Sequence, residues 1–243
     1  ACVLLVQPLP LYYVIRATLD PAFVTPALPT GSLWAATFEA QSHGTFLDTL
    51  RVNLWEGQLA SLAWAWDNGR VFQTAALFIF GYLVGRRGLF LKENLKFWNK
   101  VLCGSLVAFF PLYGLCNMLP DFVQNPSVRT PLLLVASSLY KFAFMLLLVS
   151  AVLNGYYRTR LKERLDYLIP YGRMSLTNYI TQSIIGSMLF YNWGFGLHDK
   201  LGITACVLVG ALIFIVQLAF CRWWMRHHSH GPMEYLWKRA TWL

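Results

Sequence analysis

Residues 131–157 read PLLLVASSLYKFAFMLLLVSAVLNGYY, an apolar run in which Lys141 is the one ionisable side chain of the Asp, Glu, Lys, Arg and His types. A bilayer core about 30 Å thick needs about 20 helical residues, so this run is long enough to cross it. Working outward, five further apolar stretches occupy residues 1–15, 71–85, 101–119, 174–194 and 201–224. The pattern predicts an all-α fold, a polytopic transmembrane bundle of about six helices.

The Lys and Arg residues are distributed unevenly between these stretches. Thirteen of the 20 lie in the gaps after the second, fourth and sixth stretches and Arg222 lies at the end of the sixth, whereas five lie in the opposite gaps and Lys141 is inside the fourth stretch. Basic residues in short loops mark the cytoplasmic side of a membrane, so the C-terminus is predicted to be cytoplasmic. The same distribution accounts for the net charge of +9 without a nucleic-acid partner. The predicted partners are the bilayer and its anionic headgroups on the cytoplasmic side.

Composition excludes an ordinary soluble domain. Apolar residues make up 57% of the chain, charged residues 13%, and the mean hydropathy is +0.47. The five cysteines contain no C-x-x-C pair, and the histidines at 227, 228 and 230 have no second ligand cluster near them in the sequence. No metal site and no resident cofactor are therefore predicted.

One membrane domain is predicted over residues 1–243, with two segments outside the bilayer. Residues 20–68 form an outer-side loop, whose beginning, DPAFVTPALPTGS, contains three prolines that exclude a continuous helix. From Thr45 to Trp66, leucine and tryptophan recur every three or four residues, which predicts an amphipathic helix along the outer interface. A lid over a pocket is the alternative for this helix. Residues 225–243 form a cytoplasmic interfacial tail, with a turn at Gly231-Pro232 and a short helix beginning at Pro232.

Polar side chains interrupt two of the predicted spans. Lys141 is a functional-site candidate unless its side chain reaches the interface. In the fifth stretch Asn178, Thr181 and Gln182 share one side of a helix with Ile185. Two readings stay open for that side: hydrogen bonds to a neighbouring helix, or the wall of a substrate cavity.

Three segments resemble a known family. Residues 172–179, GRMSLTNY, are followed by Gln182-Ser183, and residues 231–239 read GPMEYLWKR. Together with GYLVGRRGLF at 81–90, they are similar to signatures of the YeiB-like bacterial inner-membrane proteins, which carry domain of unknown function 418. Two departures are Tyr235 in place of a Trp and Lys238 before Arg239. The resemblance marks these motif residues: Gly172, Thr177, Tyr179, Ser183, Gly231, Pro232, Glu234, Trp237 and Arg239.

The resemblance implies a multi-pass protein of the bacterial inner membrane and a longer parent chain of which this is the C-terminal part. An apolar run at residue 1 without a basic segment before it is also unlike a signal peptide. The family is distantly related to membrane acyltransferases that use a cytoplasmic thioester, so acyl-CoA is the implied donor. Since no histidine lies inside a predicted span, the catalytic base is expected upstream of this chain.

Three functions follow from these residues. In an acyltransferase, Arg173, Asn178 and Gln182 would hold polar groups of the donor or acceptor, and Glu234 and Arg239 would order the cytoplasmic mouth. In a transporter, Lys141, Asn178 and Gln182 would line the substrate path, with discontinuous helices and an internal repeat expected. The two halves of this chain show no such repeat. A structural membrane subunit would need no reactive groups. The protein partners are not predicted.

Overall fold

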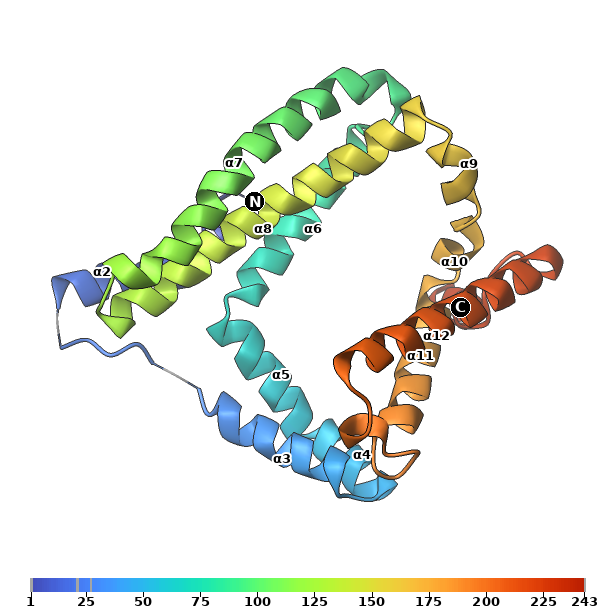
Figure 1. Cartoon of the computed structure of the whole chain (residues 1–243), viewed down its shortest axis with the longest axis horizontal. Coiled ribbons are helices and arrows are strands. Elements are labelled where there is room, and N and C mark those ends of the chain that lie inside the picture. The colour runs from blue at the N-terminus through green and yellow to red at the C-terminus, as the bar shows by residue number, and fades with distance from the viewer. Residues whose placement is uncertain (1, 21, 27, 243) are drawn as a thin grey trace. The chain divides into compact units, whose positions relative to one another are not determined.

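The computed structural model describes residues 2–20, 22–26 and 28–242, and these residues form helices joined by short connections, with no strand among them (Figure 1). The chain divides into two compact units. Unit 1 comprises Ala1–Thr30 and Leu59–Leu161, and unit 2 comprises Gly31–Gln58 and Lys162–Leu243. The all-α prediction is confirmed.

Unit 1 is built on two long helices packed side by side, α7 (Leu95–Phe122) and α8 (Pro126–Arg158) (Figure 1). Aromatic rings hold their contact: the ring of Phe109 lies 5.3 Å from that of Phe144 and 6.3 Å from that of Tyr140. Helix α2 packs on α8, and α1 packs on α6. These shorter elements are α1 (Cys2–Leu5), α2 (Pro8–Leu19) and α6 (Arg70–Arg86), with the turn η1 (Lys92–Asn94) before α7.

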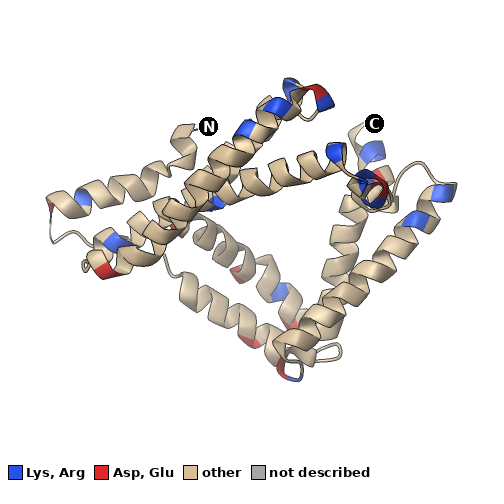
Figure 2. Ribbon diagram, turned by 45° about the horizontal axis from the view of Figure 1, so that its top comes forward, with Lys and Arg blue, Asp and Glu red and all other residues tan. Residues whose placement is uncertain are grey.

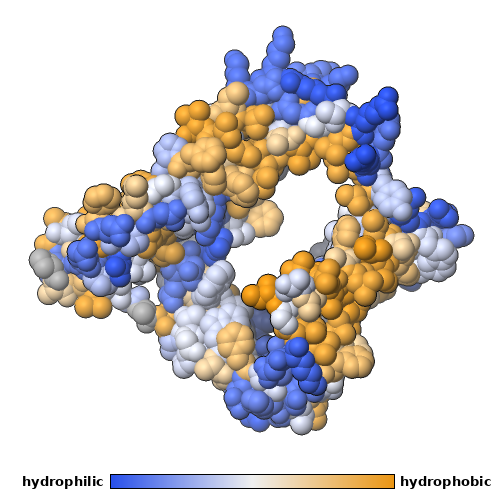
Figure 3. All heavy atoms as spheres, viewed as in Figure 1, coloured by the Kyte–Doolittle hydropathy of each residue, from blue (hydrophilic) through white to orange (hydrophobic). Residues whose placement is uncertain are grey.

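Within the part of the chain that the structure describes, three helical segments are long and apolar enough to cross a membrane: Lys92–Phe122, Pro126–Arg158 and α12 (Ile203–His227). Large apolar side chains such as Val107, Phe110 and Leu208 are exposed on them, and hydrophobic residues cover much of the surface in Figure 3. Surface of this kind requires lipid or protein cover. Lys and Arg lie mostly at the helix ends (Figure 2). The chain is thus a multi-pass membrane protein.

The other three predicted spans form shorter helices. Helix α6 has 17 residues and α11 (Ser175–Phe190) has 16, slightly less than a bilayer core requires. The first stretch is divided between α1 and α2, because the backbone of Gln7 has φ 64° and interrupts the helix. That these three segments also cross the membrane stays a prediction. Pro111, which belongs to the third apolar stretch, lies within the continuous helix α7.

The outer-side loop is more helical than predicted. Residues 30–42 form a helix, α3 (Thr30–Ser42), which begins inside the segment expected to be turn-rich. The amphipathic stretch is two helices, α4 (Phe46–Leu54) and α5 (Glu56–Asp67), with a break at Trp55. Helix α4 begins where the sequence changes character, because Thr45 and Asp48 cap its N-terminus reciprocally.

Unit 2 contains α3 and α4, the short helices α9 (Leu161–Asp166) and α10 (Ile169–Arg173), and α11, the turn η2 (Leu197–Asp199), α12 and α13 (Pro232–Thr241). Helix α10 packs on α12, and α11 packs on α13. The short helix predicted from Pro232 is confirmed as α13, with Pro232 at its first position.

Candidate functional site

The motifs at residues 172–183 and 231–239 meet in unit 2, where a side chain from α13 caps the N-terminus of α11. The first amides of a helix have no partner within it. At α11, the amides of Leu176 and Thr177 donate to Glu234 Oε1 at 2.8 and 3.1 Å, and the Thr177 hydroxyl donates to Glu234 Oε2. The residue preceding α11 is Met174, whose side chain provides no cap. The cap of α11 is therefore Glu234, which lies 57 residues after Thr177 in the sequence.

The capping is reciprocal. The amide of Met233, in the first turn of α13, donates to Thr177 Oγ1 at 3.1 Å. The residue before α13 is Gly231, which is buried and has no side chain to cap the helix. A Cβ atom at Gly231 would clash with the Glu234 carboxylate and would lie 3.0 Å from Thr177 Oγ1. Gly231, Thr177 and Glu234 thus form one joint between α11 and α13, which we call the latch.

The latch sets the ionisation of Glu234. Burial alone would raise the pKa of this carboxyl, but the hydrogen bonds from the Thr177 hydroxyl and from the amides of Thr177 and Leu176 lower it below its ordinary value of 4.5. The folded-state pKa is therefore lower than the unfolded-state pKa. The ionised carboxylate stabilises the latch above the ordinary pKa, and this stability is lost as the pH falls through the lowered value.

We expect acidification to loosen the latch. Hydrogen exchange of the amides of residues 176, 177 and 233 should be compared at pH 6 and at about pH 3.5, after correction for intrinsic exchange. Wild-type protection should fall at the lower pH. Glu234→Gln, which cannot ionise, should be less protected at pH 6 and should show no further loss on acidification. Equal pH dependence in both proteins would contradict this account of the latch.

Next to the latch, a polar network joins α10, α11 and α12. Its centre is Gln217, which is 6% exposed. Gln217 Nε2 donates to Thr181 Oγ1 at 2.8 Å and to the carbonyl of Asn178 at 3.3 Å. Its Oε1 accepts from Gln182 Nε2 at 2.9 Å and from the Tyr171 hydroxyl at 3.3 Å. Asn178, 3% exposed, donates from Nδ2 to the carbonyl of Tyr171 at 3.0 Å.

The candidate substrate-binding residues fall into different surroundings. Asn178 and Gln182 belong to the network just described. In the structure, this side of α11 therefore makes hydrogen bonds to neighbouring helices. Arg173 is exposed, and its Nη2 donates to the carbonyl of Ser229 at 2.9 Å. Lys141 belongs to unit 1 and is exposed on α8. Binding of a substrate by these residues stays a prediction.

The motif residues divide into two groups. Thr177, Gly231 and Glu234 build the latch, with Pro232 beginning α13. Tyr179 and Trp237 are instead 71% and 69% exposed. Also exposed are Gly172, Ser183 and Arg239. These exposed positions contribute little to folding within this chain and are available to lipid or to partners.

A groove lies at the turn between α12 and α13. One cavity of about 570 Å³ and a second of about 470 Å³ share Ser229, His230 and Tyr235 in their walls. The ring of His230 is held between two polar groups, with its Nδ1 2.7 Å from Ser229 Oγ and its Nε2 3.5 Å from Lys238 Nζ. The sequence predicts no metal site at this histidine and, because it lies outside the predicted spans, does not single it out as a base. Across residues 2–20, 22–26 and 28–242, no three His, Cys, Asp or Glu side chains converge as a metal site would require.

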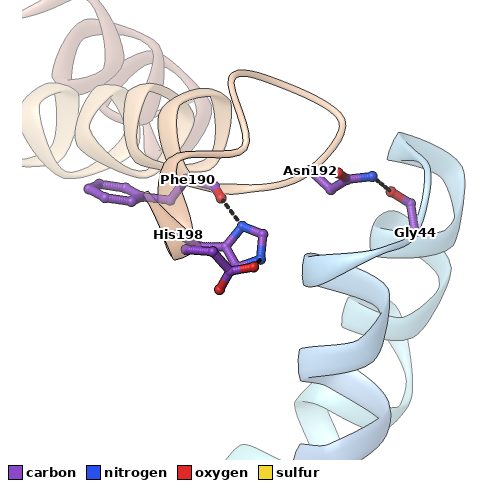
Figure 4. Close-up of polar contacts among 5 residues, drawn as sticks. Gly44, Phe190, Asn192 and His198 are labelled. Atoms are coloured by element: carbon purple, nitrogen blue, oxygen red, sulfur yellow. Dashed lines mark hydrogen bonds and ion pairs between the residues drawn. The ribbon is translucent and has the colours of Figure 1, made fainter. Parts of the chain in front are cut away.

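The other end of α11 is held by a second set of contacts (Figure 4). The amide of Asn192 donates to the carbonyl of Gln41 at 3.0 Å, and its side chain lies 3.5 Å from the carbonyl of Gly44. His198 Nδ1 lies 3.2 Å from the carbonyl of Phe190 (Figure 4). Its Nε2 is 2.9 Å from Asp199 Oδ2, within ion-pair range but without the alignment of a hydrogen bond. The Asn192 contacts join the loop after α11 to the end of α3 and the turn that follows it, and the His198 contacts lie within the loop region itself.

The geometry can be compared with known proteins. The family model described as "Protein of unknown function (DUF418)" matches residues 84–243, which include the latch, the network and the groove. The chain belongs to the DUF418 family. The resemblance expected from the two motifs is thus confirmed.

Three relatives are described as uncharacterized proteins. The chain is 38% identical to YxaH of Bacillus subtilis over 99 residues, which are 41% of this chain and 25% of YxaH. It is 38% identical to YeiB of Escherichia coli over 71 residues, 29% of this chain and 18% of YeiB. It is 30% identical over 104 residues to a 39.9 kDa protein of Bacillus acidopullulyticus, 43% of this chain and 28% of that protein. The matches span about a quarter of the relatives' lengths. No solved structure is significantly similar.

Proposed function

We propose that this protein takes part in acyl transfer at the bacterial inner membrane and binds a thioester donor in the groove beside α13. The observation that carries the proposal is the composition of the groove. Basic side chains (Lys238 and Arg239) and aromatic side chains (Tyr235 and Trp242) surround His230 in a space of several hundred Å³. The predicted topology puts this end of α12 in the cytoplasm, where thioester donors occur.

The residues present fit an acyl-CoA donor. Lys238 and Arg239 can bind phosphate oxygens through charge-assisted hydrogen bonds. Trp224 stacks on His228 with ring centroids 4.0 Å apart, and Tyr235 and Trp242 are exposed, which provides flat apolar surfaces for a nucleotide base or an acyl chain. When bound, such a donor would supply the activated acyl group.

His230 is the group placed to move a proton. An imidazole is the usual base near neutral pH, and its ring here is fixed by Ser229 and faces Lys238. The main chain is fixed as well, because Trp224 Nε1 donates to the carbonyl of His230 at 3.0 Å. This proposal revises the expectation that any base must lie outside this chain.

The experiment separates binding from chemistry. The protein in lipid nanodiscs would be titrated with [14C]acetyl-CoA, and transfer of label to endogenous or added hydroxyl and amine acceptors would be followed. We expect Lys238→Gln/Arg239→Gln to weaken donor binding by roughly 100-fold, because two phosphate contacts are lost. His230→Gln should retain donor binding and lower the transfer rate by roughly 100-fold or more.

The matched control is Lys92→Gln/Lys96→Gln, which removes the same charge from unit 1. It should leave both donor binding and transfer unchanged. Donor binding that is insensitive to Lys238→Gln/Arg239→Gln would overturn the binding site. Labelled transfer that is unchanged in His230→Gln would overturn its role as the base.

Transport is the second candidate, and one observation in unit 1 favours it. Transporters place substrate sites at discontinuous helices, and the break at Gln7 between α1 and α2 is of this kind. Uptake of labelled small carboxylates into proteoliposomes would test it. Saturable uptake that is lost in Lys141→Gln would favour transport over acyl transfer as the function of unit 1.

A further inference from the structure

We propose that unit 1 contains a binding site for a carboxylate group in a small cavity between the α1–α2 break, the beginning of α6 and the middle of α8. The cavity has a volume of about 30 Å³. Its walls are formed by polar and basic side chains together with Leu134. They are Gln7, Asn68, Arg70, Gln73, Ser137, Ser138 and Lys141.

The helix break is built around this cavity. An apolar stretch tolerates non-helical backbone in a membrane only where protein groups satisfy it or where it lines a cavity. Here the carbonyl of Leu5, freed at the end of α1, accepts from Ser138 Oγ of α8 at 3.1 Å. Gln7 has φ 64°, an unfavourable conformation for a side chain with a Cβ atom. Such strain is retained where the surrounding structure uses it.

Gln7 provides the second observation. Its side chain is 1% exposed, and its Oε1 has no hydrogen-bond partner among the described residues. Gly69 makes room for it, because a Cβ atom at Gly69 would occupy the position of that amide. A buried acceptor without a partner is costly, and an anionic guest removes that cost when the amide turns to present its NH₂ group. Rotation of the amide can present either its oxygen or its NH₂ group to that guest.

Charge identifies the guest. Two cations, Arg70 and Lys141, line the cavity, and within the described part of the chain neither is within 4.0 Å of a carboxylate. Arg70 Nη1 donates to Gln73 Oε1 at 2.9 Å and retains further donors. Helix α6 begins at this cavity, and helix N-termini favour anions.

Size restricts the class of anion. A volume of about 30 Å³ is near that of one water molecule in the liquid, which suits the end of a planar carboxylate better than a tetrahedral phosphate. Lys141 is the 16th residue of the 33-residue helix α8, so the site lies near mid-helix. The carboxylate can belong to a water-soluble acid or to a fatty acid in the membrane.

The experiment uses [13C]formate as the probe. Its 13C line width would be measured with the protein in lipid nanodiscs and with empty nanodiscs. We expect saturable broadening by the wild-type protein, competed by acetate, and affinities roughly tenfold or more weaker in Lys141→Gln and in Arg70→Gln. Arg129→Gln, in the first turn of α8 and outside the cavity wall, is the matched control and should bind as the wild type does.

The outcomes separate the sources of the carboxylate. Displacement of formate by octanoate at far lower concentrations than by acetate would assign the site to a membrane-soluble acid, and similar potency would assign it to a soluble one. The thermal unfolding of each variant would be measured to show that it is folded. Gln7→Glu places a competing carboxylate in the cavity wall and should abolish the broadening of the formate line. Broadening that is absent, or equal in all variants, would overturn the proposal and leave a cavity that holds water.

Discussion

Replacing Glu234 with alanine is expected to raise hydrogen exchange at the amides of Leu176, Thr177 and Met233 by roughly 100-fold, because the latch between α11 and α13 opens. The substitution removes two amide bonds and the bond from the Thr177 hydroxyl. Loss of an N-cap costs about 1 kcal/mol, and hydrogen bonds to a charged group contribute about 1.5–3 kcal/mol each. A local loss near 3 kcal/mol corresponds to about 100-fold in the opening equilibrium.

Exchange measured by mass spectrometry in nanodiscs would check this prediction. Glu163→Ala is a suitable control, because Glu163 is an exposed glutamate on α9 of the same unit. It should leave exchange in α11 and α13 unchanged. Exchange at the N-terminus of α11 that is the same in Glu234→Ala and in the wild type would show that the cap contributes nothing measurable.

Gly231→Ala provides an independent test of the same joint. It keeps Glu234 and Thr177 but places a methyl group against both of them. Because Gly231 has φ −67°, which alanine adopts without strain, any destabilisation comes from the clash. We therefore expect a loss similar to that of Glu234→Ala. Wild-type protection in Gly231→Ala would mean that the carboxylate has another position of equal stability.

The sequence was sufficient for those features that depend on composition and spacing. Three of the six apolar stretches are long helices, because a run such as 131–157 has no local alternative to a helix in lipid. The helix beginning at Pro232 followed from the Gly-Pro pair. The polar side of the fifth stretch was also visible in the spacing of Asn178, Thr181 and Gln182.

Other features depend on contacts between residues distant in the sequence. Glu234 caps a helix that begins nearly 60 residues earlier, and no local sequence pattern predicts that contact. The break at Gln7 depends on Ser138 in α8 and on Gly69 in the turn before α6, both distant in the sequence. A signal was present nonetheless, because Gln7 precedes Pro8 within an apolar run, and a residue before proline disfavours the helical conformation. Helix α3 was missed because its Gly and Ser residues resemble a loop.

The polar network around Gln217 allows the packing and substrate interpretations of α11 to be separated. Gln217→Leu is expected to destabilise unit 2 by about 2–3 kcal/mol, since four hydrogen bonds are lost at a side chain 94% removed from solvent contact. Hydrogen bonds between membrane helices average only about 0.6 kcal/mol each, so four of them reach the same range.

Asn178→Leu and Gln182→Leu complete the comparison. Asn178 loses the bonds to Tyr171 and Cys221, and the Tyr171 carbonyl still accepts the amide of Met174 at 3.3 Å, so about 1–2 kcal/mol is expected. Gln182 is exposed, so Gln182→Leu should lower the free energy of unfolding the least of the three. Unfolding in mixed micelles would test whether the loss of stability decreases in the order Gln217→Leu, Asn178→Leu, Gln182→Leu. If Asn178→Leu and Gln182→Leu instead keep full stability and lose acyl transfer or transport, the polar side of α11 binds substrate.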